Sequence, residues 1–121
     1  MITAIWIAAG GAAGTLARYG LAGTINASGH PWGTVVVNLT GSLALGLLIG
    51  FWGFAHVDDH QLAMTVGFLG GFTTDSTFAL DTVGILQDGR ASLAVLSVVV
   101  SVFGSPILVI VGLIAGRVLS G

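Results

Sequence analysis

The chain has 121 residues, of which 55% are hydrophobic and only 7% are charged, and its mean hydropathy is +1.03. Water could not solvate such a surface on a monomer, so we predict an integral, multi-pass membrane protein. A net charge of −2 without basic clusters excludes nucleic acid as a partner. The absence of cysteine excludes disulfides and cysteine-ligated metals.

Four segments are apolar enough to cross a bilayer, which takes roughly 20 mostly apolar residues. They cover about 2–25, 33–55, 61–86 and 91–119, and they form one transmembrane domain over 1–121. Turn-like residues separate them, with NASGHP after the first span and QDGR before the last. The sequence therefore predicts an all-α membrane protein with four transmembrane helices.

An even number of spans puts both termini on one side of the membrane. Arg117 lies on that side, whereas Arg18 and Arg90 lie toward the other. The positive-inside rule then fixes the orientation weakly or not at all. Either other signals set the topology, or the chain inserts in both orientations and pairs as an antiparallel dimer.

Each predicted span contains a GxxxG pair, whose two small residues let helix backbones approach closely in lipid. The pairs are Gly10/Gly14, Gly46/Gly50, Gly67/Gly71 and Gly112/Gly116. Packing within the chain is the more frequent use of any single pair. Since four helices enclose little volume, a polar path through so small a chain predicts a second subunit.

The third span contains the polar segment GFLGGFTTDSTF at residues 67–78. Backbone that is not helical at membrane depth is tolerated only where protein or a water-filled cavity surrounds it. The segment therefore predicts a broken helix and an ion or substrate site. Phe78 could be a packing aromatic, or it could present the positive edge of its ring to an anion.

Two polar ladders repeat every four residues, so that each lies on one helix face. They are Thr34, Asn38 and Ser42 in the second span, and Ser97, Ser101 and Ser105 in the fourth. Such residues often bond back to their own helix or join neighbouring helices. Two ladders beside a polar break favour a permeation path instead. Uncharged donors suit a small anion, and the amide of Asn38 is the strongest candidate.

Two carboxylates lie in the third span, and an intramembrane carboxylate is by default a functional hypothesis. Asp75 could bind a cation, be protonated and donate a hydrogen bond, or pair with Arg18. Asp81 lies nearer the end of the span, which favours a solvated position or a pair with Arg90.

Three blocks of sequence together resemble one known family, the bacterial fluoride channels called Fluc or CrcB. GGAAGTLARY at 10–19 is similar to the first-span motif, PWGTVVVNLTGSLALGLL at 31–48 to the second, and GFLGGFTTDSTFALDT at 67–82 to the third. The resemblance covers nearly the whole chain. It implies a four-helix subunit with a broken third helix, assembled as an antiparallel, dual-topology dimer with two fluoride pores.

The resemblance also implies individual site residues. A structural Na⁺ at the dimer interface would be held by the backbone carbonyls of Gly70 and Thr73. Arg18 matches the family's arginine and is a structural or gating candidate. The pore residues that carry over are Asn38, Ser76, Thr77, Phe78, Ser101 and Ser105. In three positions the chain departs from the family pattern: Asp75 replaces a Phe, Asp81 replaces a Glu, and Ser97 replaces a Tyr.

These residues predict a fluoride-selective channel subunit in the cell membrane that exports fluoride passively and catalyses no reaction. Its expected partners are fluoride, membrane lipid, and a second subunit that is either identical or paralogous. Because Asp75 stands at a pore position, two alternatives stay open. The chain could be a degenerate or purely structural subunit of a heterodimeric fluoride channel, or a small proton-coupled cation antiporter that uses Asp75.

Overall fold

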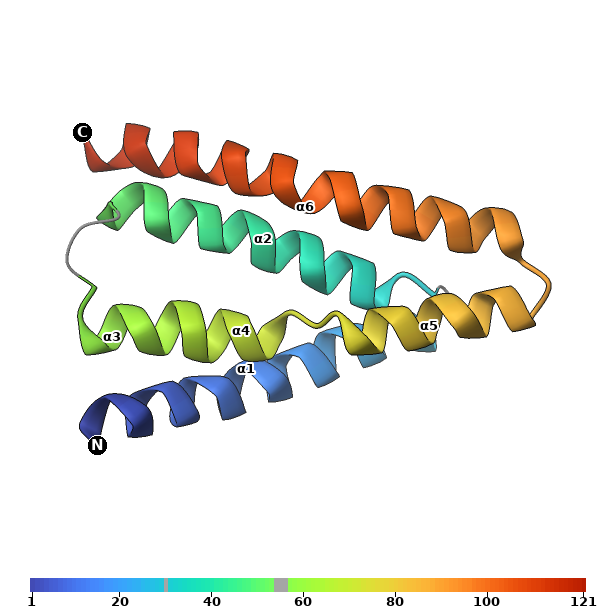
Figure 1. Ribbon diagram of the computed structural model, residues 1–121, viewed down its shortest axis with the longest axis horizontal. Helices are drawn as coiled ribbons and strands as arrows, with labels where there is room; N and C mark the ends of the chain where they lie inside the picture. Colours follow the sequence, from blue (N-terminus) through green and yellow to red (C-terminus); the bar gives the residue numbers. More distant parts are fainter. Residues whose placement is uncertain (30, 54–56) are drawn as a thin grey trace.

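The computed structural model describes residues 1–29, 31–53 and 57–121, and in these residues it contains helices and no strand. The helices form four rods, each a single helix or a run of helical segments in line, which lie side by side. Both termini are at the same end of the molecule (Figure 1). In chain order the helices are α1 (Ile2–Ala27), α2 (Gly33–Trp52), α3 (Asp59–Leu62), the π-helix η1 (Ala63–Leu69), α4 (Gly70–Phe72), α5 (Ser76–Gln87) and α6 (Ala91–Ser120). The third rod consists of α3, η1, α4 and α5, and its interruption confirms the predicted broken helix.

The helix ends differ from the predicted spans for local reasons. Helix α2 ends at Trp52 and not at Ala55, because Gly53 has a φ of 79°, a left-handed conformation that favours glycine. The third rod begins before residue 61, because Asp58 and Gln61 form a capping box at the start of α3. The rest of the second predicted span, at 54–55, and His30 in the first turn lie outside the described residues.

The four GxxxG pairs are used within the chain, as two interlocked pairs of rods. The Gly10/Gly14 pair on α1 faces the Gly67/Gly71 pair of the third rod, and the Gly46/Gly50 pair on α2 faces the Gly112/Gly116 pair on α6. A methyl group on Gly14 would overlap the carbonyl of Phe68, and one on Gly46 would overlap the carbonyl of Val109. Small residues thus allow backbone-to-backbone contact, which drives helix association in lipid.

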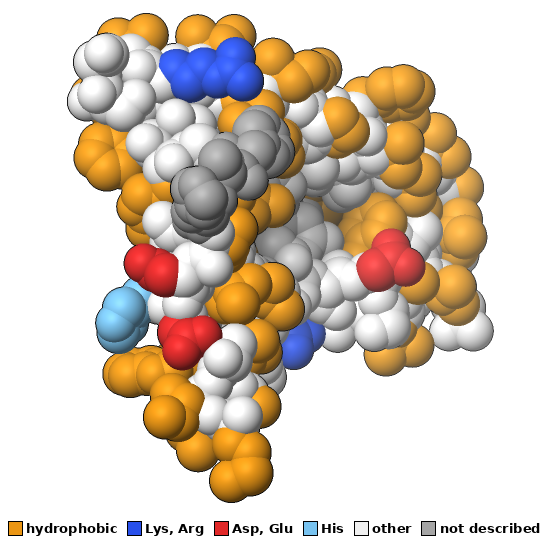
Figure 2. Space-filling view, turned by 60° about the vertical axis from the view of Figure 1, so that its left-hand side comes forward, with side chains coloured by type: hydrophobic (Ala, Val, Ile, Leu, Met, Phe, Trp, Pro, Cys, Tyr) orange, Lys and Arg blue, Asp and Glu red, His pale blue; other side chains and the backbone are white. Residues whose placement is uncertain are grey.

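Apolar side chains cover much of the face shown in Figure 2, and large exposed hydrophobic side chains lie on α1, α2, α5 and α6. Large side chains of α6 face outward, with Phe103 at 64% and Ile114 at 59% exposed. Among the described helices, α2 and α6 are each long and apolar enough to cross a bilayer. Side chains that face away from the core would be costly in water and are favoured in lipid, which indicates a membrane protein.

Candidate functional site

The third rod breaks at the polar segment that the sequence singles out. Helix α4 ends at Phe72, Thr73 is extended with φ −82° and ψ 156°, and α5 begins at Ser76. The local sequence favours the break, because glycines before it and β-branched threonines within it are poor helix formers. The break leaves backbone groups that need partners from elsewhere.

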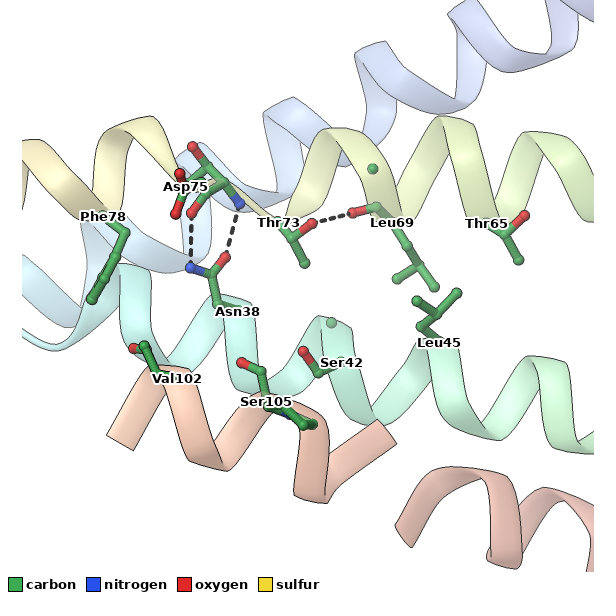
Figure 3. A pocket seen from close by; sticks show the side chains of 15 residues that line it. Asn38, Ser42, Leu45, Thr65, Leu69, Thr73, Asp75, Phe78, Val102 and Ser105 are labelled. Atoms are coloured by element: carbon green, nitrogen blue, oxygen red, sulfur yellow. Dashed lines mark hydrogen bonds between the residues drawn. The ribbon is translucent and has the colours of Figure 1, made fainter. Parts of the chain in front are cut away.

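Asn38 supplies partners for this broken backbone (Figure 3). Its Nδ2 donates to the carbonyl of Thr74 at 2.8 Å, and its Oδ1 accepts from the N–H of Thr74 at 2.8 Å. An asparagine amide has two N–H donors, so one donor remains for another acceptor. The side chain predicted to bind an anion therefore also holds α2 against the break.

Thr74 lies at the centre of the break, and the sequence analysis did not select it. Besides its two backbone bonds to Asn38, its Oγ1 accepts from the N–H of Thr77 at 3.3 Å. This hydroxyl caps the start of α5, whose N-cap residue Asp75 makes no capping bond with its side chain. The signal in the sequence was a threonine two residues before a helix start.

A hollow of about 690 Å³ lies beside the break, between α2, the third rod and α6. It brings together seven of the predicted site residues: Asn38, Gly70, Thr73, Asp75, Phe78, Ser101 and Ser105. Ser42 and Thr74 also line it, and Figure 3 places Asn38, Ser42 and Ser105 across from the third rod. The hollow is therefore lined by hydroxyl and amide groups, one carboxylate and apolar side chains.

The two ladders contribute unequally to this hollow. Ser97 is 2% exposed and its hydroxyl returns to the carbonyl of Ala94 on its own helix. Ser101 is 7% exposed, lines the hollow, and its hydroxyl has no hydrogen-bond partner among the described residues. A buried hydroxyl without a partner is costly, so the Ser101 hydroxyl would gain from a ligand or a water.

Three predicted site residues lie away from the hollow. Ser76 and Thr77, in the first turn of α5, are not among its lining residues. Arg18 reaches Thr77 instead, with 3.3 Å between its Nη1 and the threonine hydroxyl, and its buried Nε has no partner among the described residues. Arg18 thus fixes α1 to the start of α5.

The two carboxylates of the third rod have different surroundings. Asp75 is exposed and, in the described part of the chain, forms no ion pair with Arg18. Asp81 accepts a short hydrogen bond from the hydroxyl of Thr34. This bond was not predicted, and it ties α5 to α2. Asp81 is also half-exposed, and within the described residues it forms no ion pair with Arg90.

The two phenylalanines beside the break, Phe72 and Phe78, also have different surroundings. Phe78 lines the hollow. Phe72 is buried and stacks on Phe68, with 6.0 Å between the ring centroids and 8° between the ring planes. Phe72 is therefore part of the packing of the third rod.

The carbonyls of α4 can accommodate a cation. Gly70 and Thr73 line the hollow, at the C-terminal end of a helical segment where the backbone dipole is negative. Because the N–H of Thr74 donates to Asn38, the carbonyl of Gly70 lacks its regular helical partner. An unpaired carbonyl oxygen is a suitable ligand for a hard cation.

An apolar exterior, a helix broken at mid-length and a polar hollow beside the break together define a small membrane transport protein. A protein-family model described as CrcB-like protein, Camphor Resistance (CrcB), matches residues 5–113. The chain belongs to this CrcB family, so the resemblance is confirmed.

Curated relatives are similar to the chain over nearly its whole length. The fluoride-specific ion channel FluC of Paracoccus denitrificans is 45% identical over 120 residues, which cover 95% of this chain and 94% of the relative. The corresponding protein of Magnetococcus marinus is 40% identical over 119 residues, covering 94% and 97%. That of Bordetella petrii is 42% identical over 117 residues, covering 93% and 90%.

Proposed function

We propose that the chain is a subunit of a fluoride-selective channel that exports fluoride passively across the cell membrane. The observation that carries this proposal is the hollow beside the helix break, which is lined by uncharged donors and contains no Lys or Arg. Relatives about 40% identical over most of the chain are named fluoride-specific ion channels. The transport involves no bond making or breaking, so the protein is not an enzyme.

The donors act by replacing the hydration shell of the anion. Asn38 retains one N–H, the Ser101 hydroxyl has no partner among the described residues, and Ser105 and the ring of Phe78 line the same hollow. Fluoride is small and a strong hydrogen-bond acceptor, so it needs several close donors when it loses water. Neutral donors let the ion leave again, because a fixed cation would hold it too tightly.

The break places opposite ends of two helical segments beside one hollow. The N-terminus of α5, a helix of 12 residues, carries the positive end of its dipole and favours an anion. The C-terminus of α4 carries the negative end and favours a cation. In this proposal the carbonyls of Gly70 and Thr73 would hold a structural Na⁺, which neutralises the negative end of that segment.

A second subunit completes the path in this proposal. The hollow is open to the outside of a single chain, and the apolar exterior of α6 offers a surface for a partner. With its weak charge bias, the chain can insert in both orientations and form an antiparallel, dual-topology dimer. The four GxxxG pairs are used within the chain, so the dimer contact has to use other surfaces.

The proposal is tested by fluoride efflux from liposomes that contain the purified protein. Wild-type protein should release fluoride, and Asn38→Asp should abolish release, since it replaces the free N–H by a negative charge. Thr40→Val is the matched control, because the Thr40 hydroxyl is exposed on the same helix and bonds only to its own turn. Normal fluoride release by Asn38→Asp would show that Asn38 is not part of the path. If the wild-type protein released no fluoride, either alone or with a paralogous subunit, the proposal would be wrong.

Asp75 supports an alternative of another class. It is an exposed carboxylate that lines the hollow where related channels have Phe. A proton-coupled cation antiporter would use it as the proton carrier. Transport driven by a pH gradient and lost in Asp75→Asn would favour the antiporter.

The same departure allows a heterodimer in which this chain is the degenerate subunit. Fluoride release that needs a paralogous subunit would then be expected. Mass analysis of the complex purified from cells distinguishes one kind of subunit from two.

A further inference from the structure

Thr74 is the residue through which the broken backbone is held, and three of its polar groups are engaged. Its N–H and carbonyl pair with Asn38, and its hydroxyl accepts from the N–H of Thr77. The contact with Asn38 joins residues 36 positions apart, with both distances at 2.8 Å. These bonds engage two amides, those of Thr74 and Thr77, that follow the unpaired carbonyls at the end of α4.

In a regular α-helix each N–H bonds the carbonyl four residues earlier. The N–H of Thr74 would therefore pair with the carbonyl of Gly70, and the N–H of Thr77 with that of Thr73. Both amides are diverted: Thr74 donates to Asn38, and Thr77 donates to the hydroxyl of Thr74. The carbonyls of Gly70 and Thr73, which would hold the cation, are the outer two of the four that lose their regular partners at the break.

We infer that Asn38 and Thr74 are positioning residues for the cation site, because they bind the two amides that would otherwise occupy the Gly70 and Thr73 carbonyls. The inference rests on the sodium site of the proposed function and deepens it. Asn38 thus has two tasks: one N–H remains for the anion, while its other N–H and its oxygen bind Thr74 beside the cation site. Side chains in this outer position typically change metal affinity about 10- to 100-fold when they are removed.

A purely structural role would have a different signature. If Asn38 and Thr74 only held the rods together, their loss would lower the unfolding temperature by the same amount at every sodium concentration. If they prepare the cation site, their loss would also weaken the stabilisation that sodium provides, because a ligand that binds only the folded state raises its stability.

The experiment measures the thermal unfolding midpoint of the purified protein by tryptophan fluorescence, without fluoride. NaCl replaces N-methylglucamine chloride at constant ionic strength. The variants are Thr74→Val, which keeps the side-chain shape without the hydroxyl, and Asn38→Leu. Thr74→Ser restores the hydroxyl, and Thr40→Val removes a hydroxyl that bonds only within its own helix.

We expect sodium to raise the midpoint of wild type, Thr74→Ser and Thr40→Val alike. Thr74→Val and Asn38→Leu should need about tenfold more sodium for the same rise. Equal sodium dependence in Thr74→Val and wild type would overturn the inference, as would a wild-type midpoint that does not respond to sodium. Should Asn38→Leu fail to fold, Thr74→Val decides alone. Fluoride efflux is a separate measurement, so a chain that binds sodium and releases no fluoride would refute the channel and leave the inference standing.

Discussion

The α2–α6 pair and the third rod show two ways to build a helix that lies in lipid. Helices α2 and α6 are continuous, and glycines on each let the backbone of one contact the backbone of the other. The third rod is interrupted, and side chains of α1 hydrogen-bond to both of its parts: Thr3 donates to Asp59 before the break, and Arg18 donates to Thr77 after it. Small residues therefore make the close helix contacts of both regions, and polar side chains in addition hold the irregular backbone of the third rod.

The largest expected effect comes from filling the glycine contact of the continuous pair. Gly46→Ala would place a methyl group onto the carbonyl of Val109, and neither backbone can move aside without separating α2 from α6. We expect a loss of about 2 kcal/mol in the free energy of unfolding, typical of overpacking. The measurement is the unfolding midpoint together with the fraction of monodisperse protein.

A matched control lies in the broken rod. Gly84, in α5, has open space around its missing side chain. Gly84→Ala should fold as well as wild type, or better by about 0.5 kcal/mol, because alanine favours the helix. Equal losses in both variants would show that backbone-to-backbone contact is not what makes Gly46 sensitive.

The next effect separates conduction from stability. The buried hydroxyl of Ser101 has no partner in the described part of the chain, so Ser101→Ala should leave the unfolding midpoint unchanged or slightly raised. Fluoride efflux should fall by about tenfold, equivalent to one lost hydrogen bond to an ion. Ser97→Ala is the comparison, since that hydroxyl bonds its own helix, and a fall of the same size there would remove the distinction.

The smallest effect concerns the second link between α2 and α5. Thr34→Val keeps the side-chain shape and removes the bond to Asp81, which should cost about 1 kcal/mol of folding free energy. Thr82→Val is the control, because the Thr82 hydroxyl returns to the carbonyl of Phe78 within α5. If both variants unfold at the same temperature, the Thr34–Asp81 bond does not hold the third rod.

Local sequence rules predicted much of the fold. Apolar runs located the rods, and the Gly/Thr/Ser cluster located the break. The fourfold spacing of Ser97, Ser101 and Ser105 predicted a ladder, yet Ser97 bonds its own helix and only Ser101 and Ser105 line the hollow. Sequence spacing predicts which residues share a helix face. It does not predict which of those residues lie beside a hollow and which pack against a neighbouring helix.

The contacts of the broken rod could not be predicted in this way. An extended residue at Thr73 resets the helical phase, so spacing no longer relates residues before the break to those after it. Ser76 and Thr77 consequently lie away from the hollow although Asp75 and Phe78 line it. The pairings of Asn38 with Thr74 and of Thr34 with Asp81 depend on the register of α2 against the third rod, which is set by tertiary packing.

The most direct test of the account compares fluoride and chloride release from the same liposomes, with potassium and valinomycin setting the voltage. Neutral donors at the break should strip water from the smaller halide, so fluoride should leave at a rate set by the voltage while chloride stays inside. Release of both halides at similar rates, or fluoride release that follows a pH gradient and ignores the voltage, would contradict the account.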